Sequence, residues 1–345
     1  MQKIYKAIFT HFNYSSRRKS LIIFTFLTFE LFLLVLIFLL SLKITSILKE
    51  DYSRHKYKTS INKNTLSFDS TISALKYFYE PVPNSIETWN PDWLGYEVKN
   101  TINEDSLNES KTFQINKPTK TYRIIALGDS YTYGLYVPTN STYPKILEKQ
   151  LNEQLHCPDI KEFEVLNLGV TAYDVAYTVE RFLKRGIKYS PDLVIWLIHN
   201  WNLGRIRDYN IPLQKELEKQ GIPVFNSITK EHIADIADKK IEEQYGEKYV
   251  IDFQQYAFER LFDKYPSTII FFTYSSISLK NKQFLSDQTL KYKNVSFYSD
   301  LTNTGSIEQY HVPDGHPSKT GHVVIASEIF KHIKNSLFST CIKKN

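Results

Sequence analysis

The longest hydrophobic pattern in the sequence is a continuous apolar run, LIIFTFLTFELFLLVLIFLLSL, at residues 21–42. As a helix, a run of this length spans a hydrocarbon core of roughly 30 Å. A cleaved signal peptide has a shorter apolar region followed by small residues at the cleavage site. The segment after the run, KITSILKED, offers no such site. The pattern therefore predicts an uncleaved transmembrane signal anchor over 21–42.

Charges around this run indicate an orientation. Residues 1–20 contain Arg17, Arg18 and Lys19 next to the run and no acidic residue. Positive residues stay on the cytoplasmic side, so 1–20 is expected to be a cytoplasmic tail, although lysines and arginines also follow the run. Glu30, inside the run, is costly in lipid and marks either a helix partner or a tolerated polar position.

Beyond Thr121 the pattern becomes an alternation of strands and helices. Apolar runs of strand length occupy residues 122–127, 163–168, 192–198, 268–274 and 295–298. Helical spacing of apolar residues separates them, at residues 142–155, 174–186, 250–265 and 318–337. Such alternation is typical of a parallel sheet covered by helices, and strands that are apolar throughout are buried on both faces. The expected fold class is α/β, a three-layer α/β/α arrangement with a parallel, flavodoxin-like sheet, plus one N-terminal transmembrane helix.

The same patterns divide the chain into parts. Residues 43–118 are rich in Lys, Asn, Ser and Thr, with an aromatic island at 89–98, and are expected to form a stalk and lead-in. The main domain is expected over 119–338, followed by a tail at 339–345. Residues 203–249 interrupt the alternation and are interpreted as an insertion. It is either a lid over the site or a solvated surface excursion, and its charged composition favours the second.

The amino-acid composition argues against several classes of function. The net charge of +6 is spread along the chain, without a basic stripe interleaved with stacking aromatics, so nucleic-acid binding is not expected. The two cysteines, Cys157 and Cys341, are far apart and form no CxxC motif, which disfavours a thiolate zinc site. Two free thiols are the favoured interpretation. A disulfide remains open if the domain faces an oxidising space.

Candidate chemistry lies in the stretch ALGDSYTYG, residues 126–134, which places Ser130 directly after a predicted strand. Ligands bind at the carboxyl ends of parallel strands. A serine becomes a nucleophile only when a base takes its proton. Asp314 and His316 lie two residues apart in a loop with two prolines, where the carboxylate could orient the imidazole toward a serine. A simple polar turn is the alternative interpretation of ALGDSYTYG.

Three histidines near Asp314 also raise the question of a metal. They are His311, His316 and His322. A proline-rich loop followed by a histidine on the next helix is not a known ligand spacing, so no metal site is expected.

Taken together, G-D-S-x-T-x-G after the first strand and D-x-H-P before the last helix resemble the outer blocks of the SGNH/GDSL hydrolase family, over residues 121–335. EVLNLGVTAYD, at 164–174, resembles the second block. The resemblance implies Ser130 as nucleophile, His316 as general base and then acid, and Asp314 as the orienting carboxylate. It also implies that the backbone amides of Ser130 and Gly169 stabilise the oxyanion.

The third block of the family is where the sequence departs. The family has an Asn-Asp pair after its Pro-Asp-Leu-Val strand, whereas this chain reads SPDLVIWLIHNWNLGR. Asn200 and Asn202 flank the expected place, and either side-chain amide could complete the oxyanion hole. Loss of one such donor costs roughly a hundred- to a thousand-fold in rate. The departure therefore bears on catalytic rate and leaves the expected fold unchanged.

The sequence thus predicts a single-pass membrane protein with an extracytoplasmic catalytic domain. Its expected function is that of a serine esterase or O-acyltransferase acting on an acyl ester of a cell-envelope glycan or lipid, without metal or organic cofactor. Its expected partners are that acyl-ester substrate and the membrane, through residues 21–42. The alternative is a catalytically weak module of the same fold that binds acylated carbohydrate or an envelope assembly partner.

Overall fold

The computed structural model describes Thr25, Leu39 and residues 27–36, 66–68, 75–226, 229, 231–274, 277–301, 308–338 and 341–343. The chain forms two compact units, Met1–Lys56 and Tyr57–Asn345. In the first unit, residues 27–36 are helical and expose apolar side chains such as Leu31 and Phe32. The remaining parts of the predicted anchor, apart from Thr25 and Leu39, lie outside the described residues. No described helix is both long and apolar enough to cross a membrane, so the anchor over 21–42 stays a prediction.

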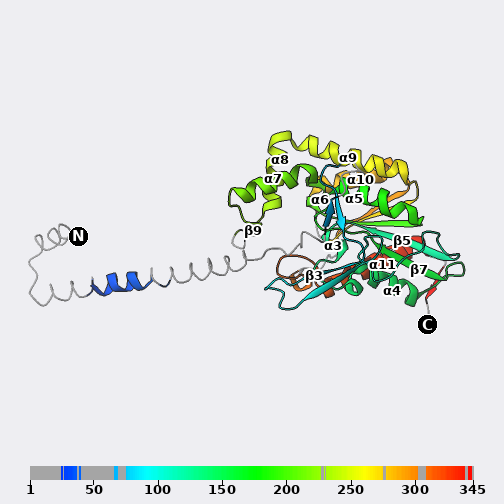
Figure 1. The fold of residues 1–345 in the computed structure, drawn as a ribbon, viewed down its shortest axis with the longest axis horizontal. Helices are drawn as coiled ribbons and strands as arrows, with labels where there is room; N and C mark the ends of the chain where they lie inside the picture. The colour runs from blue at the N-terminus through cyan, green and yellow to red at the C-terminus, as the bar shows by residue number, and fades with distance from the viewer. Residues whose placement is uncertain are drawn as a thin grey trace, which may run out of the picture. The chain divides into compact units, whose positions relative to one another are not determined.

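The second unit is built on a five-stranded parallel sheet (Figure 1). Its strands, in chain order, are β5 (Thr121–Leu127), β7 (Glu162–Asn167), β8 (Leu193–Ile198), β11 (Thr268–Thr273) and β12 (Val295–Tyr298). Their spatial order is β12-β11-β8-β5-β7, which is the flavodoxin-like order 2-1-3-4-5 read from the other edge. The predicted strands and the parallel, flavodoxin-like sheet are confirmed.

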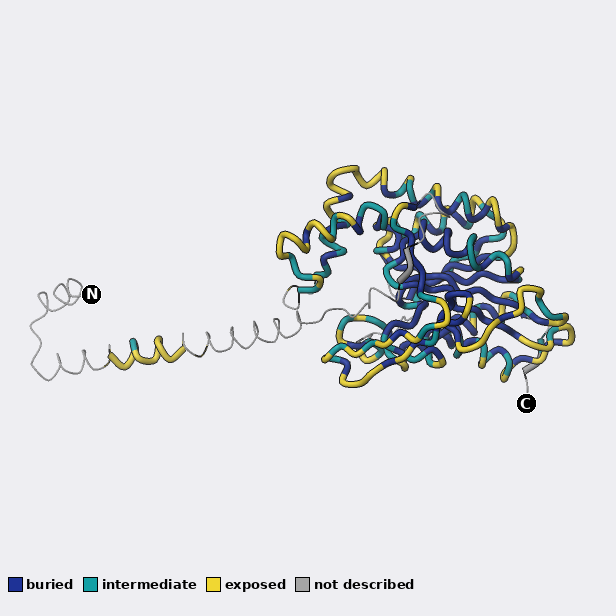
Figure 2. Tube along the Cα trace, in the orientation of Figure 1, coloured by how far each residue is buried: buried dark blue, intermediate teal, exposed yellow. Residues whose placement is uncertain are grey.

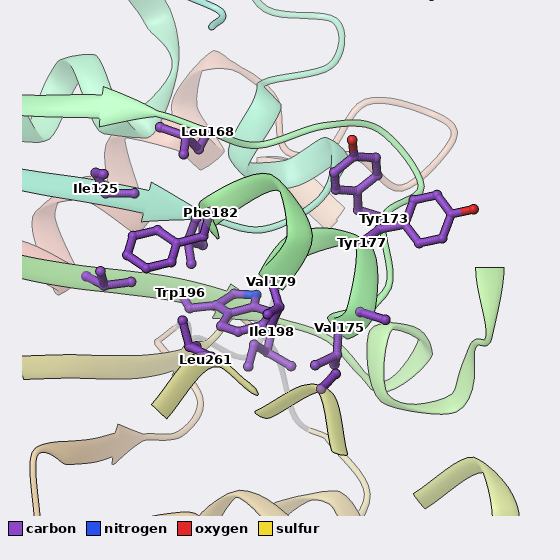
Figure 3. Packing of buried hydrophobic residues seen from close by; sticks show 14 of the residues in the cluster. Ile125, Leu168, Tyr173, Val175, Tyr177, Val179, Phe182, Trp196, Ile198 and Leu261 are labelled. Carbon is purple, nitrogen blue, oxygen red and sulfur yellow. The ribbon is translucent and has the colours of Figure 1, made fainter. Parts of the chain in front are cut away.

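Helices cover both faces of this sheet, as the alternation predicted (Figure 1). On one face, α4 (Tyr143–Gln154) packs beside α11 (Lys319–Leu337), and Leu147 and Ile329 join Ile195 of β8 in one buried cluster. On the other face lie α5 (Val175–Arg181) and α9 (Glu247–Lys264). Figure 3 shows Trp196 of β8 packed among side chains of this second layer, including Val179 and Leu261.

Several elements were not predicted from the sequence. They are α3 (Ser130–Tyr133), α6 (Asn200–Gly204), α7 (Arg207–Lys219), α10 (Leu279–Lys291), a hairpin of β3 (Ser85–Trp89) and β4 (Val98–Ile102), and the short strands β1 (Leu66–Phe68), β2 (Tyr79–Pro81), β6 (Leu155–His156) and β13 (Ile342–Lys343). Short helical turns occur at η1 (Thr139–Ser141), η2 (Phe182–Gly186), η3 (Ile187–Tyr189) and η4 (Glu308–Tyr310). In α10 the buried residues are Leu285 and Gln288, so its sequence carries little helical periodicity.

The predicted insertion is a packed part of the unit. It contains α7, the short strands β9 (Phe225–Asn226) and β10 (Glu231–His232), and α8 (Ile233–Tyr245). In α8 the buried residues Ile233, Ala237 and Ile241 recur every four positions, which gives the helix one apolar face. The outer surfaces of these helices are exposed (Figure 2). The charged helix expected here therefore has a buried side that anchors it.

Residues from Leu75 onward also pack into the core, so this part of the lead-in belongs to the body of the domain. Phe78 and Phe113 lie in the same cluster as the strands β5 and β8. The buried carboxylate of Glu80 forms ion pairs with Arg181, Lys184 and Arg185 of the α5 segment. A buried charge is stable only when paired in this way, so these ion pairs fix the lead-in to α5.

The two cysteines form a disulfide, which corrects the favoured interpretation of two free thiols. β13 pairs antiparallel with β6, with Ile342 opposite His156. This pairing brings Cys341 beside Cys157, with their Cα atoms 4.4 Å apart. The cysteines are 184 positions apart in the chain, and no local pattern in the sequence indicates that the C-terminal tail returns to β6.

Candidate active site

Ser130 lies at the carboxyl edge of the sheet, where β5 turns into α3. Gly128 has φ +150°, and a Cβ atom there would lie 2.9 Å from the Leu197 carbonyl oxygen. Asp129 caps α3, since its side chain accepts a hydrogen bond from the Tyr131 N–H at 2.8 Å. Gly134, in the left-handed region, ends the helix. Ser130 is thus the first residue of a short, tightly fixed helix, where its N–H has no intrahelical partner.

His316 lies in a short loop before α11. The N–H of Val312 donates to the His316 carbonyl at 2.8 Å, which closes the loop. Ser318 caps α11 by accepting from the Gly321 N–H at 3.3 Å. The Tyr131 hydroxyl donates to the Gly315 carbonyl at 2.7 Å and so ties α3 to this loop. The two segments are therefore held together next to Ser130.

The structure brings together the three residues that the sequence assigned to catalysis. Ser130 Oγ lies 2.9 Å from His316 Nε2, across 186 positions of the chain. His316 Nδ1 lies 3.0 Å from Asp314 Oδ2. The Nδ1–H does not point directly at this oxygen, so the pair is within reach but not aligned, as is common in sites without substrate.

The charges of the site favour a basic imidazole and an ionised carboxylate. Burial acts to lower the pKa of His316, but the Asp314 carboxylate and then Asp129 raise it above its ordinary value. Burial acts to raise the pKa of Asp314, but His316 and the Tyr136 hydroxyl hold it below its ordinary value. The arrangement can therefore accept a proton at His316 Nε2 while Asp314 stays negative.

Tyr136 is a site residue that sequence reasoning missed. Its backbone has φ +68°, its hydroxyl helps to lower the pKa of Asp314, and its ring meets the His316 ring edge-on at 5.4 Å. Trp93 and Trp89 pack against it at 4.8 and 6.1 Å between ring centroids. The aromatic island at 89–98 thus supports the Asp314–His316 pair through Tyr136, and no spacing in the sequence indicates this contact.

The groups expected to donate to the oxyanion, at Gly169, Asn200 and Asn202, make other hydrogen bonds in the structure. The Gly169 N–H donates to Asn167 Oδ1 at 3.0 Å. The Asn202 side chain donates to the Tyr173 carbonyl at 2.8 Å and accepts from the His199 N–H at 2.7 Å. Asn200 Oδ1 accepts from the Ser278 N–H at 2.8 Å, at the start of α10. The structure therefore does not bring the amides of Gly169 and Asn202 to Ser130 as free donors, and it directs Asn200 toward α10.

Solved structures include proteins similar to this chain. A lipase/acylhydrolase from Enterococcus faecalis is 14% identical, with 65% of this chain and 99% of that chain covered and a TM-score of 0.39. A family two carbohydrate esterase from Clostridium thermocellum, in complex with cellohexaose, is 13% identical over 66% of this chain and 68% of that chain, with a TM-score of 0.39. A psychrotrophic esterase from Pseudoalteromonas sp. is 13% identical over 63% and 99%, with a TM-score of 0.37.

The chain resembles the SGNH/GDSL hydrolases. At these identities and TM-scores the likeness says nothing about the activity or the substrate of this chain. No protein-family model and no curated protein matches the sequence.

His322 is a second buried histidine near the Asp314–His316 loop. His322 Nδ1 accepts from the Tyr143 N–H at 3.0 Å, and burial lowers the pKa of His322 to about 3. Burial also lowers the pKa of His311. Among the residues that the structure describes, no three His, Cys, Asp or Glu side chains gather closely enough to hold a metal ion. His322 therefore fastens α11 to α4.

β10 of the insertion carries a further partly buried histidine, His232. Burial lowers the pKa of His232, and the charges of His316 and Asp314 also act on it. The His232 ring packs on Phe225 of β9, with 4.6 Å between centroids. This ring contact joins the two short strands of the insertion, which pair antiparallel.

Proposed function

We propose that this chain is a serine-dependent enzyme that transfers an acyl group from an ester, either to water or to a second alcohol. The observation that carries the proposal is the 2.9 Å contact between Ser130 Oγ and His316 Nε2, with Asp314 at 3.0 Å from the other ring nitrogen. A base whose second nitrogen faces a carboxylate is the arrangement that activates a serine hydroxyl.

The reaction follows from this geometry. Ser130 Oγ attacks the carbonyl carbon of the ester while His316 Nε2 takes the hydroxyl proton. His316 then returns this proton to the departing alcohol oxygen, and an acyl-serine remains. Water, or a hydroxyl of an acceptor glycan, attacks the acyl-serine with the same base, and Ser130 is regenerated. Asp314 stabilises the imidazolium in each half-reaction without taking the proton.

We further propose that the substrate is an acyl ester of a cell-envelope glycan or lipid, and that residues 21–42 anchor the chain with its domain outside the cytoplasm. The basic residues 17–19 support this orientation. The Cys157–Cys341 disulfide supports it too, because disulfides persist in oxidising compartments.

The test is covalent labelling of the full chain with a fluorophosphonate, together with hydrolysis of 4-nitrophenyl acetate. The proposal expects labelling at Ser130, and loss of labelling and of roughly 10⁶-fold in turnover in Ser130→Ala. His316→Ala should lose about as much, and the double variant little more. Ser336→Ala, which removes an exposed hydroxyl near the end of α11, is the matched control. Labelling that persists in Ser130→Ala would contradict the proposal.

A second candidate, a catalytically weak module that binds acylated carbohydrate, draws support from the oxyanion donors. The amides of Gly169 and Asn202 are engaged within the protein. If the wild-type chain binds acetylated glycan but Ser130 is not labelled, this second candidate replaces the first.

A further inference from the structure

Acyl transfer needs hydrogen-bond donors aimed at the carbonyl oxygen, which becomes negative when the serine attacks. The side-chain donors expected on the loop after β8 were Asn200 and Asn202. Asn202 joins Tyr173 to His199, and Asn200 faces the start of α10. The residue before them, His199, has a side chain that the chemistry above does not use.

His199 leaves the same edge of the sheet as Ser130. β5 and β8 are parallel neighbours, with Leu127 opposite Trp196. Ser130 and His199 each follow this pair by three residues. The His199 ring meets the ring of Tyr131, the residue after the serine, at 4.1 Å between centroids, whereas Tyr274 on the β11 side is 6.5 Å away. The imidazole therefore lies on the β5 side, beside α3.

The capping-box contact of His199 indicates which of its two ring nitrogens carries the proton. His199 caps α6, and its side chain accepts the backbone N–H of Asn202. The accepting atom is Nδ1, because no atom of the described residues is a hydrogen-bond partner of Nε2. The proton is therefore on Nε2, on the edge of the ring that faces away from α6. The side chain is 5% exposed, so this N–H is a buried donor.

The His199 ring is also held in place. Trp201 stacks on it with 7° between the ring planes, and Tyr131 meets it edge-on at 66°. Burial lowers the pKa of His199, so the imidazole is neutral at neutral pH and keeps its single proton. Buried donors in proteins nearly always have a partner, so one left over against Tyr131, the residue after Ser130, requires an explanation. A hydrogen-bond donor that is held in place and shielded from water stabilises an oxyanion effectively.

We propose that His199 is a catalytic residue that donates its Nε2–H to the carbonyl oxygen of the substrate and replaces the missing third-block Asn. This inference rests on the proposed function. As Ser130 Oγ bonds to the carbonyl carbon, the π electron pair moves to oxygen and the Ser130 proton goes to His316. The proton of His199 is shared with that oxygen and is not transferred.

Two substitutions separate this role from the capping role. His199→Asn keeps a cap acceptor at the position of Nδ1 but lacks a donor at the position of Nε2. His199→Gln extends an amide to the position of Nε2. We expect His199→Asn to lower kcat for 4-nitrophenyl acetate by roughly 10²–10³-fold with little change in KM. His199→Gln should recover part of the loss. Thermal unfolding should show that the folded state persists in both variants.

A direct readout is the ¹H resonance of the His199 Nε2–H in the full chain. It should move downfield when a trifluoromethyl ketone forms a tetrahedral adduct at Ser130, and no such signal should exist in His199→Asn. A His199→Asn variant with the wild-type kcat, in a chain that Ser130→Ala inactivates, would overturn the role of His199 and leave the proposed function standing. Full activity of Ser130→Ala would overturn both.

Discussion

His316 is the residue on which the pH dependence of the chemistry rests. It must be neutral to accept the serine proton. Burial acts to lower its pKa, yet Asp314 and Asp129 raise the pKa of His316 above the ordinary value of 6.5. A raised pKa means that the base is already protonated at a pH where an ordinary histidine is still neutral. The acidic limb of kcat/KM should therefore lie above pH 6.5.

The substitution Asp314→Asn tests whether the Asp314 carboxylate raises the pKa of His316. Without the carboxylate the pKa of His316 falls, so the acidic limb should move to lower pH while the plateau rate drops by about 10²–10⁴-fold. The measurement is kcat/KM for 4-nitrophenyl acetate between pH 4 and 9 in both chains. An acidic limb that stays in place in Asp314→Asn would show that another group than His316 titrates.

Gly169 matters because its backbone packs closely against the backbone of α3. A Cβ atom at Gly169 would lie 2.2 Å from the Tyr133 nitrogen and 2.6 Å from the Thr132 carbonyl carbon, both backbone atoms of α3. Gly169→Ala must therefore push α3 and shift Ser130. We expect a loss of about 1–3 kcal/mol in the free energy of unfolding and about 10²-fold in kcat.

Gly204→Ala is the matched control, because nothing lies within 4 Å of a Cβ atom built there. In α6 this change should leave stability equal or slightly higher. Urea denaturation and ester hydrolysis of both variants provide the comparison. Equal behaviour of the two variants would contradict the packing role of Gly169.

At the residue scale, the sequence predicted the groups that act through side-chain chemistry. Each motif is common by itself, but G-D-S-x-T-x-G after the first strand and D-x-H-P before the last helix together resemble the blocks of a known family, so Ser130, Asp314 and His316 could be found. The sequence could not predict Tyr136 or the unpaired nitrogen of His199. Both depend on which neighbours occupy the other hydrogen-bonding atoms, and those neighbours come from segments that are distant in the chain.

At the element scale, the disulfide fastens the last strand to the domain. β13 is two residues long, and among the described strands it pairs with β6 alone, so the disulfide carries much of this attachment. Replacing both cysteines by serine should lower the free energy of unfolding by about 2–4 kcal/mol, because the unfolded chain gains freedom. The measurement is the urea midpoint with and without a reductant.

Reductant should lower the midpoint of the wild-type chain and leave the double serine variant unchanged. A wild-type midpoint that does not respond to reductant would contradict a disulfide in the folded protein.

Elements with a strong hydrophobic period were predictable, and those without one were not. β8 is buried at each of its six positions, and α4 has Leu147 and Leu151 on one face. By contrast, α10 buries one leucine and one glutamine, and the β3–β4 hairpin alternates exposed and buried residues around polar side chains. Their placement is decided by tertiary contacts that a local pattern does not contain.

For the whole molecule, the prediction concerns the side of the membrane on which the domain lies. Alkaline phosphatase fused after Asn345 should be active in a bacterial host, because the enzyme needs an oxidising compartment. A fluorescent protein that folds only in the cytoplasm should stay dark at the same position. The chain should remain in the membrane fraction after a carbonate wash, and deletion of residues 1–42 should release it. An inactive phosphatase fusion together with a fluorescent protein fusion that shines would place the domain in the cytoplasm and contradict the prediction.

The distance in sequence between Ser130 and His316, 186 positions, has a consequence for the newborn chain. Ribosomes add about 5–20 residues per second, so roughly 10–40 s separate the synthesis of the serine from that of its base. During this interval the nascent chain carries the Ser130 hydroxyl without the histidine that would activate it. Cys157 likewise has been made before Cys341, the cysteine with which it forms the disulfide. Under the proposed function, a chain that stops before His316 lacks the base, so acyl transfer begins only after synthesis has passed that residue.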